Sequence, residues 1–83
     1  MDTTREVLSV LEEALHLKGR TATFSGDTAL LGAVPELDSM AVVGLISALE
    51  ERFGFLIDDE EISGAIFGTV GSLTAFVDGK LAG

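Results

Sequence analysis

Apolar residues recur at helical spacing in three separate segments, and this pattern constrains the fold of the 83-residue chain more than any other feature. A spacing of three to four residues places such side chains on one stripe of a helix, and that stripe must be buried against another element. The stripes comprise Val7, Leu8, Leu11 and Leu15; Val42, Val43, Leu45, Ile46, Leu49 and Phe53; and Val70, Leu73, Val77 and Leu81. The sequence therefore predicts an all-α domain.

Polar residues and a glycine mark the expected ends of the first helix. Thr3 and Glu6 fit a capping box ahead of a helix over Thr4–Leu17. Lys18 and Gly19 then supply a cation and a glycine, which are typical of a helix end. These signals predict a first helix of nearly four turns.

Three further helices are expected after a long connection. The second runs over Ser39–Phe53 and stops at Gly54. The four acids of Asp58–Glu61 suit the positive end of a short third helix that ends near Phe67. Thr69 is expected to cap a fourth helix, which carries the last apolar stripe.

The connection from Arg20 to Glu36 has no persistent period and is unusually long for a small domain. We expect four apolar side chains to pin it across the core, namely Phe24, Leu30, Leu31 and Val34. The predicted architecture is a small four-helix bundle with three longer helices, one short third helix and a long loop between helices 1 and 2. Residues 1–83 are expected to form this one domain.

Charge and composition narrow the possible partners. Fourteen acidic and five basic residues give a net charge of -9, which disfavours nucleic acids and anionic membranes and favours basic protein surfaces. Solubility alone explains such a charge equally well. The start of the chain lacks the pattern of a signal peptide, and no apolar run approaches the roughly 20 residues of a membrane helix. We therefore expect a cytoplasmic monomer that does not insert into membranes.

The sequence offers little for catalysis. Its single imidazole, His16, falls near the end of the first helix, where a cation meets the negative end of the helix dipole. The chain has no cysteine, no glycine-rich phosphate motif and no zinc-ligand spacing. The acidic run of Asp58–Glu61 lacks the alternating ligands and central glycine of a calcium loop. These observations predict a protein that is not an enzyme and has no metal site.

One serine stands at the expected start of the second helix. An ester phosphate on Ser39 would lie near unpaired backbone N–H groups and the positive dipole end. The neighbouring carboxylate of Asp38 can help to hold a metal ion during phosphoryl transfer to the serine. Spacing alone favours a simpler interpretation, in which Asp38 or Ser39 only caps the helix.

A wider pattern favours modification of the serine. Four segments appear in order, namely Leu37-Asp38-Ser39-Met40, Ala48-Leu49-Glu50-Glu51-Arg52-Phe53-Gly54, Ile57-Asp58-Asp59-Glu60-Glu61-Ile62 and Thr69-Val70-Gly71-Ser72-Leu73. Together they resemble acyl carrier proteins and the related peptidyl carriers over nearly the whole chain. In detail, the chain looks most like the stand-alone carriers of exosortase and exopolysaccharide systems.

The resemblance implies a covalent cofactor. It places a 4′-phosphopantetheine arm on Ser39, transferred from coenzyme A by a separate phosphopantetheinyl transferase. Asp38 matches the family position that assists the transferase, and Met40 matches the apolar residue that docks beside the serine. Acyl or aminoacyl groups would be carried as thioesters, loaded by an AMP-forming ligase or a synthase and passed to an acyltransferase.

The resemblance also implies a surface that partner enzymes recognise. The matching positions are Met40, Val43, Glu50, Glu51, Asp58, Asp59, Glu60 and Glu61. For each acid, an ordinary solvated surface is an equal alternative. Carriers of fatty acids usually have acids just after the serine, whereas Ala41–Gly44 is uncharged here, which suggests a more apolar docking face. The alternative function is an unmodified acidic helical adaptor for protein–protein interaction.

Overall fold

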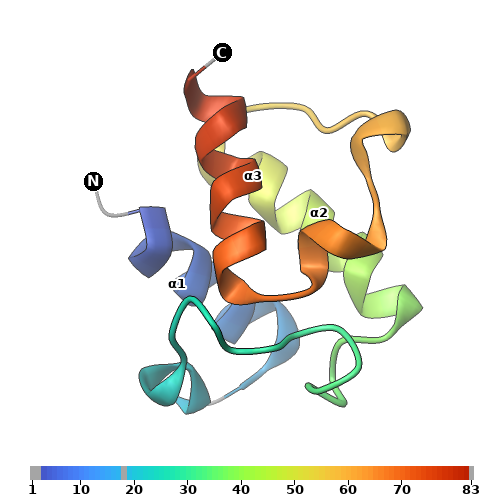
Figure 1. The fold of residues 1–83 in the computed structure, drawn as a ribbon. Coiled ribbons are helices and arrows are strands. Elements are labelled where there is room, and N and C mark those ends of the chain that lie inside the picture. The colour runs from blue at the N-terminus through green and yellow to red at the C-terminus, as the bar shows by residue number, and fades with distance from the viewer. Residues whose placement is uncertain (1–2, 18, 83) are drawn as a thin grey trace.

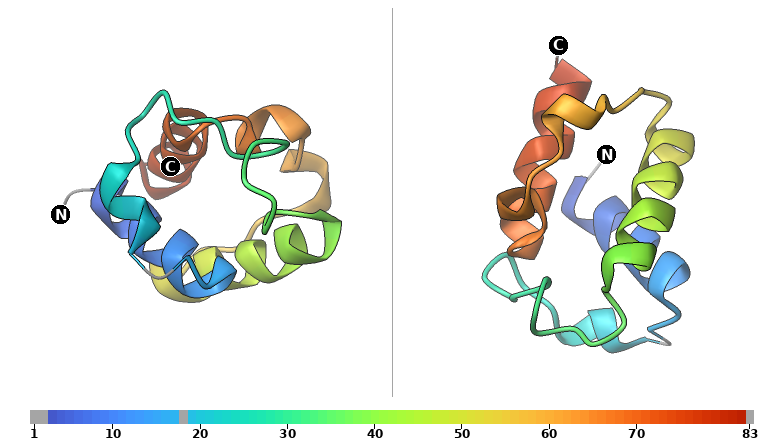
Figure 2. Two further views of the ribbon diagram at one scale, coloured as in Figure 1. Left: turned by 90° about the horizontal axis from the view of Figure 1, so that it is seen from below. Right: turned by 90° about the vertical axis from the view of Figure 1, so that its right-hand side faces the viewer.

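Three α-helices enclose one apolar core in the computed structural model, which describes residues 3–17 and 19–82 (Figure 1). The helices are α1 (Thr3–Leu15), α2 (Ser39–Phe53) and α3 (Val70–Ala82). Short 3-10 turns lie in the connections, namely η1 (Arg20–Thr23), η2 (Asp59–Glu61) and η3 (Gly64–Phe67). Helix α1 packs against both α2 and α3, as two further views show (Figure 2). The all-α prediction is confirmed, but the described residues form three α-helices rather than four.

Helix α1 ends at Leu15, earlier than predicted. His16 adopts a left-handed φ of 55°, which a right-handed helix cannot continue through. The N–H of Leu17 then donates to the carbonyl of Glu12 at 3.0 Å, the bond of a Schellman helix end. Leu17 is fully buried, so the helix stops where the chain turns an apolar side chain into the core.

Two of the predicted end signals of α1, Thr3 and Gly19, do not cap the helix. Gly19 lies in the turn before η1 with φ of 85°, and Lys18 is outside the described residues. Thr3 is already helical, so its predicted role as a cap is wrong. Its proposed partner Glu6 instead accepts a hydrogen bond from Arg52 Nη1 at 2.8 Å, because the carboxylate faces α2.

The prediction of a short third α-helix that begins at Asp58 and ends near Phe67 is wrong. The segment forms η2 and η3, separated by extended backbone at Ile62 and Ser63, with ψ of 125° and 160°. A run of about ten residues with a serine and Gly64 at its centre is too short and too weak a helix former to hold one α-helix. The extended break also allows Ile62 to pack against the core.

The predicted fourth helix forms as α3, and Thr69 caps it as expected. Thr69 Oγ1 accepts the N–H of Ser72, and Ser72 Oγ accepts the N–H of Thr69, both at 3.0 Å. This reciprocal pair of hydrogen bonds is a capping box in which a serine replaces the usual glutamate. It satisfies backbone donors that the first turn of a helix otherwise leaves unpaired.

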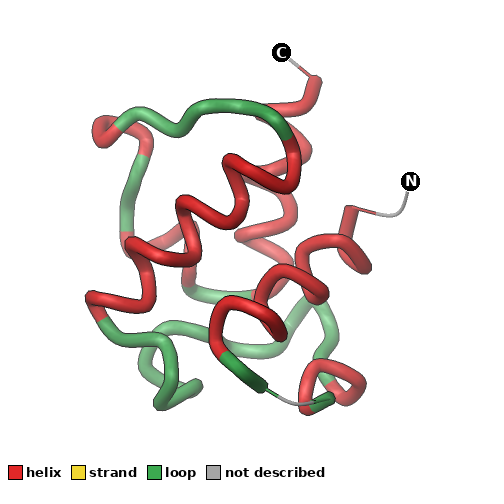
Figure 3. The backbone as a smooth tube through the Cα atoms, turned by 180° about the vertical axis from the view of Figure 1, so that it is seen from behind, coloured by secondary structure: helices red, strands yellow, loops and turns green. Residues whose placement is uncertain are grey.

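The long loop is hydrogen-bonded to the start of α3 and crosses one end of the bundle (Figure 3). The N–H groups of Val70 and Gly71 donate to the carbonyls of Thr28 and Gly26 at 3.0 and 2.8 Å. A Cβ on Gly71 would lie 2.9 Å from the Gly26 carbonyl oxygen. Glycine at position 71 therefore permits the close approach of loop and helix.

Two more backbone bonds extend this contact. Leu30 and Leu31 donate to the carbonyls of Gly68 and Phe67, both at 2.9 Å. Leu30 is fully buried and Val34 nearly so, which confirms them as anchors of the loop, and Phe24 packs partly against the core. Leu31 is 44% exposed, so the prediction that it anchors the loop is wrong. Its neighbour Leu30 takes the inward position instead.

The core joins all three helices and the loop. Its buried members are almost entirely aliphatic, as composition predicted, and comprise Val7, Val10, Leu11, Leu15, Leu17, Leu30, Val34, Leu37, Leu45, Leu49, Phe67, Val70, Leu73 and Val77. On α2, Leu45 and Leu49 confirm the predicted inward stripe, but Val43 of the same stripe is 63% exposed, so its predicted burial is wrong. On α3, Val70, Leu73 and Val77 confirm the stripe. Leu81, at the end of the same stripe, is 42% exposed.

Replacing Thr74 with valine is expected to stabilise the protein. Thr74 is buried on α3, and its hydroxyl has no hydrogen-bond partner among the described residues. Because an unsatisfied buried hydroxyl costs roughly 1–3 kcal/mol, Thr74→Val should raise the free energy of unfolding by about 1 kcal/mol. Urea unfolding measures this. As a contrast, Ser72→Ala removes a hydroxyl that accepts the Thr69 N–H and donates to the Ile66 carbonyl, and it should lower stability. Destabilisation by both changes would contradict the assignment.

Candidate attachment site at the start of α2

Ser39 is the first residue of α2, and its side chain is exposed. Asp38 precedes it as the helix cap, with Oδ1 accepting the N–H of Ala41 at 2.8 Å. The carbonyl of Asp38 accepts the N–H of Val42 at 3.0 Å and so begins the helical ladder. The capping role allowed for Asp38 is therefore confirmed, and the cap leaves the neighbouring serine hydroxyl facing solvent.

The core fixes the chain just before the serine. Leu37 is buried, and its N–H donates to the carbonyl of Val34 at 3.0 Å. Val34 in turn donates to the carbonyl of Leu30 at 2.8 Å. Gly32 closes this turn with φ of 88°, a conformation that favours glycine. The apolar anchors of the long loop therefore set where α2 begins.

The start of α2 suits a phosphate ester. The backbone N–H groups of Ser39 and Met40 have no acceptor in the part of the chain that the structure describes. Unpaired donors and the helix dipole favour an anion at this position. The residues present therefore fit a phosphate attached to Ser39, with the rest of an arm extending into solvent.

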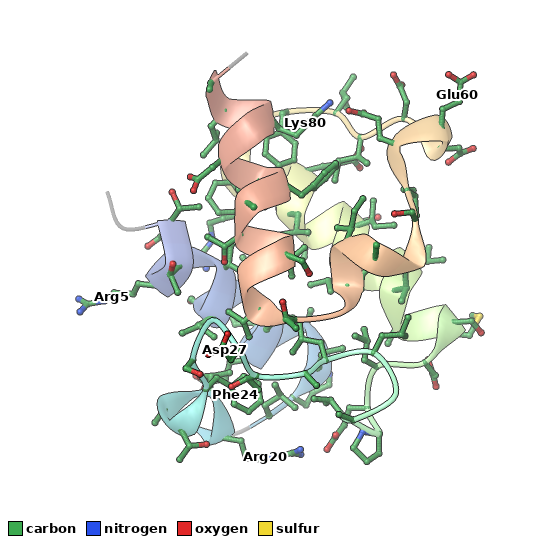
Figure 4. All side chains as sticks on the ribbon, viewed as in Figure 1. Arg5, Arg20, Phe24, Asp27, Glu60 and Lys80 are labelled. Carbon is green, nitrogen blue, oxygen red and sulfur yellow. The ribbon has the colours of Figure 1, made fainter. Side chains whose placement is uncertain are left out.

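An ion pair lies just before the start of α2. Arg20 Nη1 donates to Glu36 Oε2, which joins η1 to the end of the loop. This hydrogen bond is the main cause that holds the pKa of Glu36 below its ordinary value. Arg20 projects from the loop end of the bundle (Figure 4). The pairing leaves Glu36 ionised, with its charge matched by a local cation.

Removing the cap should weaken the fold slightly. Asp38→Ala deletes the acceptor of the Ala41 N–H, so the free energy of unfolding should fall by about 1 kcal/mol. Asp38→Ser retains a capping oxygen and should recover most of that stability. Urea unfolding of the two variants tests this assignment. Equal stability of the alanine and serine variants would show that the side-chain bond does not stabilise α2.

The apolar positions predicted for partner contact are exposed. Met40 is 79% exposed and Val43 is 63% exposed, although both are large hydrophobic side chains. They lie three residues apart on α2 and therefore share one helix face. Ala41 and Val42, between them, are partly buried against the core. The structure thus brings two of the predicted contact residues together beside Ser39.

The predicted acids divide into two groups. Glu51 and the acids of positions 58–60 are exposed, and Glu60 points away from the bundle (Figure 4). Glu50 instead accepts the N–H of Ile57 at 2.8 Å, and Glu61 accepts from Lys80 Nζ at 2.8 and 2.9 Å. Glu50 and Glu61 therefore have structural roles. Sequence spacing gave no signal for Lys80, which is 19 positions away from Glu61.

Acid should remove the contribution of Glu61 to stability. Hydrogen bonds from Lys80 and from the Asp58 N–H hold the pKa of Glu61 below 4.5, its ordinary value. A lowered folded-state pKa stabilises the fold above pH 4.5, and this stabilisation is lost as pH falls through the folded pKa. Wild type should therefore exceed Glu61→Gln in unfolding free energy at pH 7, and the difference should shrink in acid. A difference that grows in acid would contradict the pairing.

Comparison with known proteins identifies the class. A family model described as "Phosphopantetheine attachment site" matches residues 5–77. The solution NMR structure of a holo acyl carrier protein from Nitrosomonas europaea is 48% identical, covers 100% of both chains and superposes with a TM-score of 0.93. A search of curated proteins gave no significant match. The chain is a phosphopantetheine-binding carrier domain.

More specifically, the chain belongs to the acyl carrier protein family. It is therefore a non-catalytic carrier, and its cofactor is covalently attached 4′-phosphopantetheine. This membership favours the carrier function over the unmodified adaptor. None of the helices in residues 3–17 and 19–82 is long and apolar enough to span a bilayer.

Proposed function

We propose that Ser39 carries the phosphopantetheine arm and that acyl or aminoacyl groups travel as thioesters on its thiol. The observation that supports this is the exposed hydroxyl at the first residue of α2, beside two unpaired backbone N–H groups. Those donors would bind the arm's phosphate, while Asp38 lies next to the serine, where a transferase acts. The chain has no cysteine, so the arm supplies the only thiol.

The proposed partners follow from this chemistry. A phosphopantetheinyl transferase attaches the arm, an AMP-forming ligase or a synthase loads it, and an acyltransferase receives the cargo. The exposed residues Met40, Val43 and Glu51 lie on α2, downstream of the serine, where such enzymes would approach. The exposed acids at positions 58–60 add negative charge beyond α2, which attracts basic enzyme surfaces.

Incubation with coenzyme A and a broad-specificity phosphopantetheinyl transferase tests the proposal. Intact mass spectrometry should show the addition of one arm and no more. Because the thiol of the arm is the only one in the product, a thiol-specific reagent should label the modified protein and leave the unmodified protein unlabelled. Protein that stays unmodified with several active transferases would contradict the proposed function.

A further inference from the structure

A short antiparallel ladder of backbone hydrogen bonds joins the long loop to the start of α3 (Figure 1). It comprises positions 26–31 of the loop and positions 67–71 on the other side, and we call it the loop–α3 ladder. A bridge between Ala29 and Thr69 lies at its centre. Four N–H groups donate across it at 2.8–3.0 Å, namely those of Leu30, Leu31, Val70 and Gly71. Because the donors come from both segments, neither segment can move away without breaking bonds of the other.

One glycine determines how closely the two segments approach. A Cβ on Gly71 would lie 2.9 Å from the Gly26 carbonyl oxygen, which is closer than Cβ atoms come to backbone atoms in folded proteins. A Cβ on Gly26 would meet no atom within 4 Å, and the φ of Gly26 is not positive. The ladder therefore requires glycine at position 71 but not at position 26.

Backbone hydrogen bonds continue from the ladder to the candidate attachment serine. The Leu30 carbonyl accepts the N–H of Val34 at 2.8 Å, and the Val34 carbonyl accepts the N–H of Leu37 at 3.0 Å. The side chains of these three residues are all buried, with no more than 5% exposed. Leu37 is followed by Asp38, the cap of α2, and then by Ser39. Consecutive bonds and buried side chains therefore connect the start of α3 to the start of α2.

The helices themselves provide little other connection between these two points. Helix α1 packs against both α2 and α3, whereas α2 and α3 make little direct backbone contact with each other in the described part of the chain. The side-chain bonds of Arg52 to Glu6 and Ser9 join α2 to α1, but they lie at the end of α2 that is far from Ser39. The loop–α3 ladder is thus the backbone connection between α3 and the serine.

We propose that the loop–α3 ladder positions Ser39 for attachment of the arm, with Gly71 as a positioning residue for this reaction. Gly71 lies 32 positions after the serine, on a different helix, and acts through the Gly26 carbonyl and the bonded loop. This inference rests on the proposed function, because it requires the arm to be attached at Ser39.

The chemistry of the transfer explains why position matters. The Ser39 oxygen forms a bond to the β-phosphorus of coenzyme A, the pyrophosphate P–O bond breaks, and adenosine 3′,5′-bisphosphate leaves. The serine proton passes to a base of the transferase. The attacking and leaving oxygens must lie roughly in line. A misplacement of about 1 Å can cost about a hundredfold in rate when it spoils such an alignment.

Amide hydrogen exchange of the unmodified protein tests the ladder without the arm. In the wild type, the four donors of the ladder should exchange through one shared opening, with similar protection. Gly71→Ala should speed the exchange of the other three donors at least tenfold more than that of Leu11 and Leu49, inside α1 and α2. Gly26→Ala places the same methyl group in open space and should leave this exchange unchanged.

Arm transfer from coenzyme A by a broad-specificity transferase tests the consequence for the serine. Gly71→Ala should lower kcat at least fivefold and change the KM for the carrier by less than twofold, because the serine is displaced while the exposed face of α2 is kept. The matched control is Gly79→Ala, which adds the same methyl group to α3 where no atom lies within 4 Å. It should retain the wild-type kcat within twofold.

Thermal unfolding shows whether each variant is folded at the assay temperature. If Gly71→Ala alone does not fold, the same change is made together with Thr74→Val, which is expected to stabilise α3. Widely different protection of the four donors in the wild type, or equal acceleration at the ladder and inside α1 and α2, overturns the ladder as one unit. A folded Gly71→Ala protein with the kcat of Gly79→Ala overturns the positioning role. Wild-type protein that accepts no arm overturns the proposed function, and the exchange results still test the ladder.

Discussion

Ser39→Ala should abolish addition of the phosphopantetheine arm. The proposal places the phosphodiester on one oxygen, the exposed hydroxyl at the start of α2, and alanine has no atom that can replace it. The intact mass of the variant should stay unchanged after prolonged incubation with coenzyme A and a transferase. The rate of modification should fall below detection rather than decrease by a small factor.

A second serine on the same helix provides the control. Ser47 is also exposed on α2, so Ser47→Ala changes the same chemistry at a position inside the helix, where no N–H group is unpaired. This variant should accept one arm. Neither hydroxyl has a hydrogen bond to another described residue, so both variants should unfold within about 0.5 kcal/mol of wild type. An arm on Ser39→Ala would refute the proposed attachment residue.

Leu30→Ala should cause the largest loss of stability among the changes considered. The Leu30 side chain is fully buried, and its backbone bonds both the turn before Ser39 and the segment before α3. Deleting a buried leucine side chain costs about 2–5 kcal/mol, a large share of the roughly 5–15 kcal/mol that stabilises a domain. Urea unfolding should therefore show a midpoint well below that of wild type.

The next residue gives a matched comparison for this change. Leu31 is 44% exposed and makes a similar backbone bond, so Leu31→Ala removes the same atoms from a partly solvated position. Its effect should be less than half that of Leu30→Ala. Equal losses would show that the loop is not anchored through Leu30. Arm addition to Leu30→Ala should also slow under mild denaturant, because the anchored loop positions the start of α2.

Much of the fold could be predicted because local signals agree with the tertiary structure. The bounds of α2 match the prediction, since Asp38 provides a cap, the apolar period is wide and Gly54 adopts φ of 76° at the end. The Thr69 cap of α3 was also predictable from the threonine before the last apolar stripe. At both helices, propensity, capping and burial favour the same structure.

The predictions that were wrong concern segments in which tertiary contacts, rather than the local sequence, determine the backbone conformation. An acidic first turn indicated a helix after Asp58, yet Ile62 packs on the core and the segment divides into two 3-10 turns. His16 ends α1 because Leu17 is buried beyond it, which no local signal showed. The pairing of the long loop with α3 depends on contacts between residues more than 35 positions apart, and single-sequence patterns do not report these.

The candidate site was predictable for a different reason. Its signal is a short motif at a helix start, and Ser39, Asp38 and Met40 all lie where the motif placed them. The roles of the acidic residues were less predictable, because charge alone does not reveal which carboxylates form hydrogen bonds or ion pairs within the chain. Glu50 and Glu61 bind groups of this chain, whereas Glu51 has no hydrogen bond or ion pair with another residue in the part of the chain that the structure describes.

Fragment mass spectrometry of the protein purified from its own cell tests the central claim most directly. Digestion should yield one phosphopantetheine-bearing peptide, and fragmentation should locate the modification on Ser39, with any cargo attached through the terminal thiol. A phosphopantetheine group on another residue, or native protein that carries none, would contradict the account.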